Sequence, residues 1–306
     1  MNLNLLIVAM FVAIGPVWGV AAKLNVVATL PDSAAIARAI VGDVGTVTCL
    51  AQGSEDPHFV APRPSYIRTL NRADVLIEGG ADLEIGWLPP LVSGARNSKI
   101  RPGAKGRIST AKGLRLLDVS TGPIDRSAGH VHAAGNPHFL MDPLRGKVVA
   151  QNITIRLSRI DPSNASKYRS NLDKFVKRLD AKLKEWSERM SGHKGIAFVS
   201  YHKTFDYFAE RYGLVVVGQL EPKPGVSPTP AHVKALVPKA KAESVKIVVI
   251  GSFRSRRMAD YLAKLTEASV LVLPVMPMDD LSVDSYFNWI EAIVSAFDDS
   301  LLTTGR

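Results

Sequence analysis

Two kinds of segment alternate along the chain after residue 22. Short β-branched runs predict buried strands, and stretches with apolar residues every three or four positions predict helices between them. In the first half these elements are strands at 24–30, 46–50 and 75–80, and helices at 34–41 and 64–71. Residues 93–107 are basic and contain glycine, which predicts a surface loop. Strands that alternate with helices in this way are typical of a parallel sheet.

A longer helical region follows in the middle of the chain. Asp142-Pro143 is a strong helix start, an N-cap acceptor followed by proline, and that helix is expected to reach Ile160. Apolar residues then keep a helical period from Ser163 to Met190, which predicts one helix about 40 Å long. After it the alternation returns, with strands at 195–200, 214–220, 246–250 and 270–273, and helices at 203–212, 229–243, 258–266 and 285–297.

The predicted fold is therefore α/β, with two lobes that contain parallel sheets and a long backbone α-helix that joins them. The expected boundaries are 23–142 for the N-terminal lobe, 143–191 for the connecting helices and 192–306 for the C-terminal lobe.

The first 22 residues have the features of a signal peptide. They carry no charged side chain, and the apolar run from Leu5 to Val20 is shorter than the ~20 residues of a membrane span. Small residues at Gly19-Val20-Ala21 suit cleavage, which predicts export to the periplasm. No cysteine directly follows the run, so a lipoprotein anchor is not expected. The alternative is an uncleaved N-terminal anchor, because the positive flank is missing.

The amino-acid composition excludes several classes of protein and of functional site. The apolar content of 46% excludes a disordered chain. One cysteine, Cys49, excludes an intramolecular disulfide and any CxxC zinc or redox site. The net charge is +10, but the lysines and arginines are scattered and not clustered with aromatic residues. We therefore expect no nucleic-acid partner.

Three of the seven histidines lie where ligand loops of α/β sheets are found. His58 follows the second predicted strand, His138 precedes the helix that begins at Pro143, and His202 directly follows a strand. Neutral imidazole is a common ligand of zinc and copper, so three converging histidines would form a metal site. A single histidine is more often a helix cap or a partly buried residue. The pattern alone indicates no more than a candidate metal site between the two lobes.

Four segments, in chain order, resemble the ZnuA/TroA-like family of zinc- and manganese-binding receptors of ABC importers. They are DPHFVAPRPS from Asp56, GNPHFLMDP from Gly135, YHKTFDYFAERYGL from Tyr201 and EPKPGVSPTPAHVKAL from Glu221. The resemblance covers nearly the whole chain after the predicted signal peptide. It implies two α/β lobes joined by a long helix, with one metal ion bound between them.

The resemblance also implies a ligand set. His58, His138 and His202 match the three histidine ligands of the family. The fourth ligand, a carboxylate from a late loop, matches Asp279 best, with the adjacent Asp280 as the alternative. A solvated pair of acidic residues is the other interpretation of these two positions.

The remaining histidines match no ligand position. His130 and His132 either relay metal to the site or are plain surface residues, and the second interpretation is favoured. His193 and His232 are interpreted as structural.

Three imidazoles and one carboxylate favour four-coordinate Zn²⁺. Mn²⁺ is the runner-up, since it prefers more oxygen ligands and manganese-specific relatives tend to carry an acidic residue where this chain has His202. The predicted function is a monomeric receptor, not an enzyme, that delivers Zn²⁺ to a membrane permease. A metallochaperone is a further candidate partner. A manganese receptor, a zinc-dependent hydrolase and a receptor for an organic solute are the alternatives.

Overall fold

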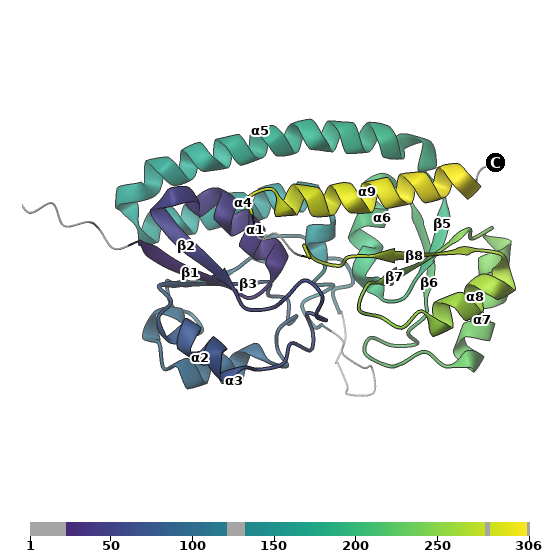
Figure 1. Ribbon diagram of the computed structural model, residues 1–306, viewed down its shortest axis with the longest axis horizontal. Coiled ribbons are helices and arrows are strands. Elements are labelled where there is room, and N and C mark those ends of the chain that lie inside the picture. Colours follow the sequence, from purple (N-terminus) through teal and green to yellow (C-terminus); the bar gives the residue numbers. More distant parts are fainter. Residues whose placement is uncertain (1–22, 121–131, 279–281, 305–306) are drawn as a thin grey trace, which may run out of the picture.

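The computed structural model describes residues 23–120, 132–278 and 282–304, and these form two lobes around two parallel sheets (Figure 1). The first sheet has the order β2-β1-β3-β4, and the second has the matching order β6-β5-β7-β8. The strands of the first are β1 (Leu24–Ala28), β2 (Gly45–Cys49), β3 (Val75–Glu78) and β4 (Arg107–Ser109). Those of the second are β5 (Ala197–Ser200), β6 (Val215–Gln219), β7 (Ile247–Gly251) and β8 (Ser269–Leu273). The predicted fold class is confirmed.

In each sheet an inner strand, β1 or β5, pairs with a neighbouring strand on both sides. Val26 of β1 pairs with Val47 on one side and Val75 on the other. Phe198 of β5 pairs in the same way with Val216 and Ile247. Because every pair is parallel, the carboxyl ends of the strands lie along one edge of each sheet. The predicted lobe boundaries stay predictions.

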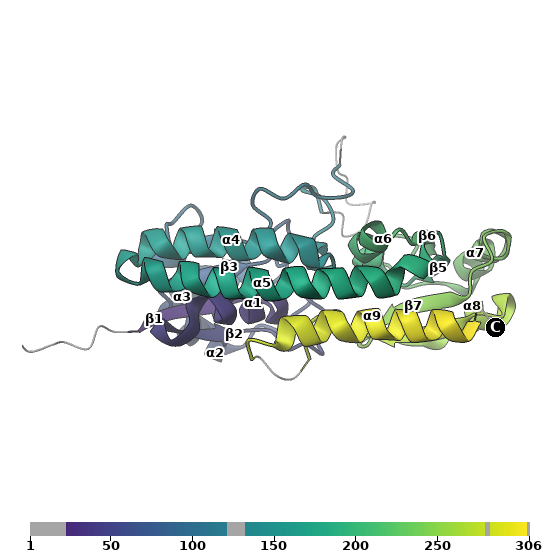
Figure 2. The ribbon, with the colours of Figure 1, turned by 90° about the horizontal axis from the view of Figure 1, so that it is seen from above.

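Helices cover the sheets and connect the lobes. The helices of the first half are α1 (Pro31–Val41), α2 (Pro64–Asn71), α3 (Leu88–Ala95), α4 (Pro143–Ile160) and α5 (Ala165–Met190). The second half contributes α6 (Asp206–Tyr212), α7 (Pro230–Ala242), α8 (Arg257–Thr266) and α9 (Ser285–Thr304). Figure 2 shows α4, α5 and α9 side by side, with α5 and α9 extending from one lobe to the other.

The long helix predicted from the apolar period is present. The 26 residues of α5 give a length of about 39 Å. It ends at Met190 as predicted and begins at Ala165, two residues after the predicted start. α4 also begins as predicted, because Asp142 accepts a hydrogen bond from the backbone N–H of Leu144 at 3.0 Å.

Two expectations need correction, and α3 and β4 were not predicted. α1 begins at Pro31 and not at residue 34, because proline suits the first turn of a helix. Residues 93–107 are not one surface loop, since they contain the end of α3 and the start of β4. The two prolines at the start of α3 look like helix breakers but lie in its first turn, where proline is tolerated. β4 has only three residues, too few to show an alternating pattern.

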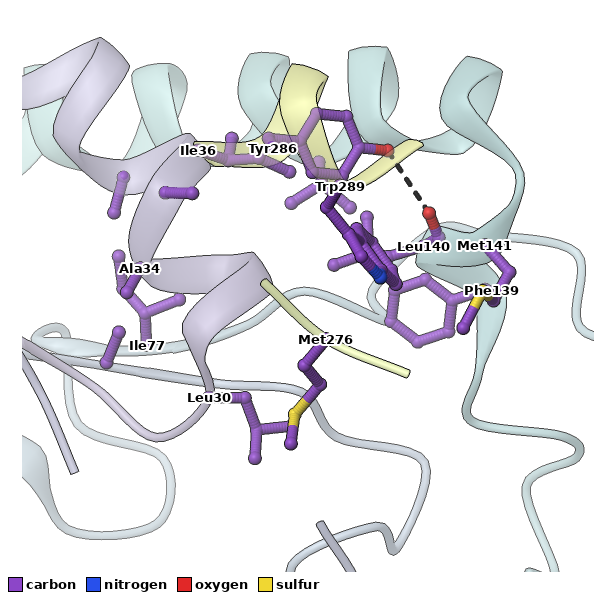
Figure 3. Close-up of a cluster of buried hydrophobic side chains, with 14 of the residues drawn as sticks. Leu30, Ala34, Ile36, Ile77, Phe139, Leu140, Met141, Met276, Tyr286 and Trp289 are labelled. Carbon is purple, nitrogen blue, oxygen red and sulfur yellow. Dashed lines mark hydrogen bonds between the residues drawn. The ribbon is translucent and has the colours of Figure 1, made fainter. Parts of the chain in front are cut away.

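One apolar cluster beneath the helical layer contains residues of both lobes, and a second cluster lies within the C-terminal lobe. The first cluster contains Ile77 of the first sheet together with Phe198 and Val249 of the second. Figure 3 shows part of it, where Tyr286 of α9 donates a hydrogen bond to the carbonyl of Leu140 at 3.2 Å. The lobes are therefore joined by packing as well as by the chain.

Charged residues join α5 to α9 along the same layer. Glu291 accepts hydrogen bonds from the Trp186 indole at 2.8 Å, from the Lys182 ammonium at 2.9 Å and from Arg189. Among the helices of the described residues, none is both long enough and apolar enough to cross a membrane. The predicted signal peptide, residues 1–22, lies outside the described part of the chain.

Candidate metal centre

Three histidines from separate parts of the chain meet between the lobes. His58 follows β2, His202 lies two residues beyond β5, and His138 immediately precedes a short 3₁₀ turn at Phe139–Met141. Their ring centroids are 5.1 to 5.3 Å apart in all three pairs. One ligand nitrogen from each lies within 4.8 Å of the other two. The structure thus brings together the three histidines that the sequence singled out, at a spacing that suits one metal ion.

Carboxylates orient two of the rings. His58 Nδ1 lies 2.7 Å from Asp56 Oδ1, and His202 Nδ1 lies 2.9 Å from Glu221 Oε2. A neutral imidazole that donates its Nδ1 proton to a carboxylate keeps the Nε2 lone pair free for a metal. This arrangement of carboxylate, histidine and metal is common in metalloproteins.

The Nε2 atoms of His58 and His138 are buried, and neither has a hydrogen-bond partner in the described part of the chain. A buried polar nitrogen without a hydrogen-bond partner is unfavourable, and such atoms are available to bind a ligand. A metal ion at the centre of the cluster would satisfy both atoms.

Burial keeps these two imidazoles neutral. It lowers the pKa of His58, against the opposing effect of the hydrogen bond to Asp56. Burial also lowers the pKa of His138 well below the usual value, and the neighbouring His58 and His202 act in the same direction. Only the neutral form coordinates metal, so both rings are ready to bind at neutral pH.

Asn136 anchors the loop that carries His138. Its side-chain amide donates to the carbonyl of Lys203 in the second lobe at 2.9 Å, and its Oδ1 accepts from the His138 backbone N–H at 3.0 Å. Its backbone carbonyl accepts from the Tyr207 hydroxyl at 2.7 Å. Gly135 before it has φ +113°, a conformation that favours glycine. The Gly-Asn-Pro-His sequence therefore ties His138 to the second lobe.

A second layer of charged groups surrounds the histidines. One guanidinium nitrogen of Arg254 lies 3.1 Å from Asp56 Oδ2 and 3.4 Å from Glu221 Oε1. Burial alone would raise the pKa of Asp56, but the hydrogen bond from His58 and the charge of Arg254 lower it overall. Sequence reasoning missed the roles of Asp56, Glu221 and Arg254. Only Asp56, two residues before His58, lies close enough to a candidate ligand in sequence to have been suspected.

The loop that carries Asp56 and His58 touches the late loop of the second lobe. A Cβ atom at Gly53 would lie 2.0 Å from the carbonyl oxygen of Pro277, so only glycine permits this approach. Asp279 and Asp280 follow directly in sequence but lie outside the described residues. Asp279 as the fourth ligand remains a prediction.

The other histidines have varied surroundings. His132 is half-buried, with its ring 5.3 Å from that of His58, so it does not fit the favoured interpretation of a plain surface residue. The backbone N–H of Gly135 donates to the carbonyl of His132 at 3.0 Å, so a turn connects His132 to the loop of His138. His193 Nε2 lies 2.8 Å from Asp298, and His232 Nε2 lies 3.1 Å from the carbonyl of Gln219, which agrees with structural roles. His130 lies outside the described residues.

Comparison with known sequences identifies related proteins. Residues 26–300 match the family model described as "ZnuA: Zinc-uptake complex component A periplasmic". The high-affinity zinc uptake system protein ZnuA of Bacillus subtilis is 26% identical over 289 residues, which cover 92% of this chain and 88% of that protein. The metal ABC transporter substrate-binding lipoprotein ScbA of Streptococcus cristatus is 28% identical over 253 residues, which cover 81% and 78%.

Solved structures share the fold. A crystal structure of ZnuA aligns with a TM-score of 0.75 and 23% identity, over 91% of this chain and 99% of that one. The binding protein FpvC from Pseudomonas aeruginosa, in complex with Mn²⁺, aligns with a TM-score of 0.78 and 21% identity, over 92% and 100%. Because the family model matches most of its length, the chain belongs to the ZnuA family of periplasmic components of zinc-uptake complexes.

Proposed function

We propose that this protein is the extracytoplasmic receptor of a metal ABC importer, and that it captures one Zn²⁺ between its lobes. The observation that carries the proposal is the His58, His138 and His202 cluster, in which two buried Nε2 atoms have no partner in the described part of the chain. The ion is cargo, so the protein must bind it tightly and then release it to a membrane permease.

Zinc is preferred over manganese because of the ligand chemistry. Three imidazole nitrogens in a small site suit four-coordinate Zn²⁺, whereas Mn²⁺ favours oxygen ligands and higher coordination. The relatives leave both metals open, because one solved structure with this fold contains Mn²⁺. A competitive titration of the purified chain with Zn²⁺ and Mn²⁺ distinguishes the two, and tighter binding of Mn²⁺ would reverse the choice.

A zinc-dependent hydrolase is the alternative from a different class. It would need an open coordination position and a carboxylate that is free to act as a general base. The two described carboxylates that contact the cluster, Asp56 and Glu221, are instead occupied by histidine nitrogens and by Arg254. This supports the receptor. Hydrolysis of ester or peptide substrates by the zinc-loaded protein would favour the enzyme.

The ligand assignment is tested by single substitutions. His58→Ala, His138→Ala and His202→Ala should each weaken Zn²⁺ binding at least about tenfold, because each removes one of few ligands. His232→Ala is the matched control, since its ring contacts the carbonyl of Gln219 instead. Unchanged affinity in all three ligand variants, measured by competition with a chelator, would refute the assignment.

The fourth ligand is proposed to be Asp279, a carboxylate that would offset part of the charge of the ion. Asp279→Ala should still bind zinc but release it faster into excess chelator in a stopped-flow experiment. Asp280→Ala is the adjacent control and should behave like the unmodified chain. Faster release by Asp280→Ala alone would assign the fourth ligand to Asp280. If neither variant changes the release rate, water or another group is the fourth ligand.

The partners and location follow from the receptor role. We propose a periplasmic, monomeric protein that is exported through the signal peptide and docks on an ABC permease. A metallochaperone is a further proposed partner. Zinc uptake by cells that lack the gene, compared with complemented cells, tests the transport role.

A further inference from the structure

A charged bridge connects the two lobes behind the histidines. Asp56 belongs to the first lobe and follows β2, whereas Glu221 and Arg254 belong to the second lobe and follow β6 and β7. The Arg254 guanidinium lies within 3.4 Å of both carboxylates. Each of these carboxylates holds the Nδ1 atom of one histidine, so an unbroken chain of contacts runs from His58 to His202 through Arg254.

The bridge is shielded from water. The side chain of Glu221 is 3% exposed, that of Asp56 is 14% exposed and that of Arg254 is 19% exposed. Ion pairs in such surroundings are weakly screened, and the loss of one partner leaves a buried charge that is costly. The bridge therefore resists separation of the two carboxylates.

The arginine itself is held in place. Its backbone N–H donates to the carbonyl of Gly251 at 2.9 Å, which forms a tight turn directly after β7. Its guanidinium lies 5.0 Å from the ring centroids of both Tyr201 and Phe253, within the range of cation–π attraction. The end of a rigid strand and two aromatic rings thus fix the position of the charge.

We propose that Arg254 is a positioning residue for metal binding, which holds His58 of one lobe at binding distance from His202 of the other before the ion arrives. The proposal rests on the proposed metal-receptor function. One guanidinium nitrogen reaches both carboxylates while the guanidinium group lies near the rings of Tyr201 and Phe253, and a compact ammonium cannot make all of these contacts equally well.

If Arg254 acts only through its charge, its removal should change the metal affinity in the opposite direction. A cation close to the site repels Zn²⁺, so its removal alone would strengthen metal binding. If Arg254 positions the histidines, its removal weakens binding despite the lost repulsion. The direction of the change in affinity therefore separates the two roles.

The test is a Zn²⁺ competition titration on the full chain with Arg254→Gln. We expect binding that is about 10 to 100 times weaker, with one zinc per chain retained, as for other groups that orient metal ligands. Arg256→Gln is the matched control in the same loop, because Arg256 is exposed and pairs only with Asp260 among the described residues. Unchanged or tighter binding by Arg254→Gln would overturn the proposal.

Arg254→Lys keeps the charge and provides a second measurement if Arg254→Gln does not fold. We expect it to bind zinc more weakly than the unmodified chain and to shift the visible absorption of bound Co²⁺, which reports ligand geometry. An unchanged affinity and spectrum in Arg254→Lys would contradict positioning through two contacts. Arg254→Gln combined with Asp56→Asn should weaken binding by less than the sum of the two single effects, since both variants break the same contact between Arg254 and Asp56.

The two proposals fail in different ways. If the unmodified chain and Arg256→Gln take up no zinc, the proposed function is wrong. If both bind zinc and Arg254→Gln binds it equally well, only the role of Arg254 is wrong.

Discussion

At the scale of single residues, the hydrogen bond at Nδ1 of a histidine determines whether its Nε2 is free to bind a metal. Asp56 and Glu221 hold the Nδ1 atoms of His58 and His202 and so fix which nitrogen faces the centre. His138 lacks such a carboxylate among the described residues, and its loop is held by the Asn136 side chain instead. The positions of the three rings therefore depend on groups that do not touch the metal.

The buried imidazoles should titrate at low pH. In the metal-free chain we expect His58 and His138 to have protonation midpoints below 6.5, since burial disfavours the charged form. The unfolded chain then binds more protons below pH 6.5, so these two residues lower the free energy of unfolding as pH falls through that range. NMR titration of the imidazole resonances measures this, with the urea-unfolded chain as the control. Midpoints at or above 6.5 in the folded chain would contradict it.

The candidate ligands were predictable from sequence, but the groups that orient them were not. His58, His138 and His202 lie beside prolines, strand ends or helix starts, which are features that can be read locally. Arg254 is more than 30 residues from Glu221 and almost 200 from Asp56, and only the meeting of strand ends from two sheets brings them together. Long-range contacts of this kind leave no periodic pattern in the chain.

At the scale of elements, close contact between two loops depends on Gly53. Gly53→Ala places a Cβ atom against the Pro277 carbonyl, so we expect the loop with His58 to move and zinc affinity to fall severalfold. Gly192→Ala is the control, because nothing lies within 4 Å of its added Cβ atom. Chelator competition on both variants gives the comparison, and equal affinities would show that the loop adapts without cost.

The contact between α5 and α9 depends on Glu291. Burial would raise its pKa, but hydrogen bonds from Trp186, Lys182 and Arg189 outweigh this and lower the pKa to about 2. The carboxylate therefore contributes stability above pH 4.5, which is lost as pH falls toward 2.

Glu291→Gln should lower the free energy of unfolding at pH 7 by about 1–3 kcal/mol, because it removes charge-assisted hydrogen bonds. The difference from the unmodified chain should shrink below pH 4.5. Denaturant unfolding at pH 7 and pH 3.5 measures both effects. Glu188→Gln is the control on α5, since its carboxylate is 67% exposed. A pH-independent difference would mean that packing, and not charge, is lost.

The regular elements were the more predictable part of the fold. The α5 helix could be read from its period because 26 residues repeat the pattern many times. The three residues of β4 give no such signal, and its pairing with β3 depends on the rest of the sheet. Errors in element ends, as at Pro31, arose where a residue suits both a turn and the first turn of a helix.

At the scale of the whole molecule, two helices limit how the lobes can move. α5 and α9 both extend across the lobes, and a shared core lies beneath them (Figures 1 and 2). We expect the radius of gyration to change by less than about 1 Å when zinc binds, because closure about a wide hinge would bend both helices. Small-angle X-ray scattering of the metal-free and loaded chain tests this. A change of several ångströms would require a hinge.

The packing of α9 also has a consequence for the order in which the molecule can form. Tyr286 and Trp289 of this last helix are buried in the same cluster as Ile36 of α1, although some 250 residues separate them along the chain. The lobe that is synthesised first therefore cannot complete its core until the final helix has emerged. In a polypeptide that passes through a narrow pore with its N-terminus leading, Ile36 could be buried against α9 only after residue 285 had passed.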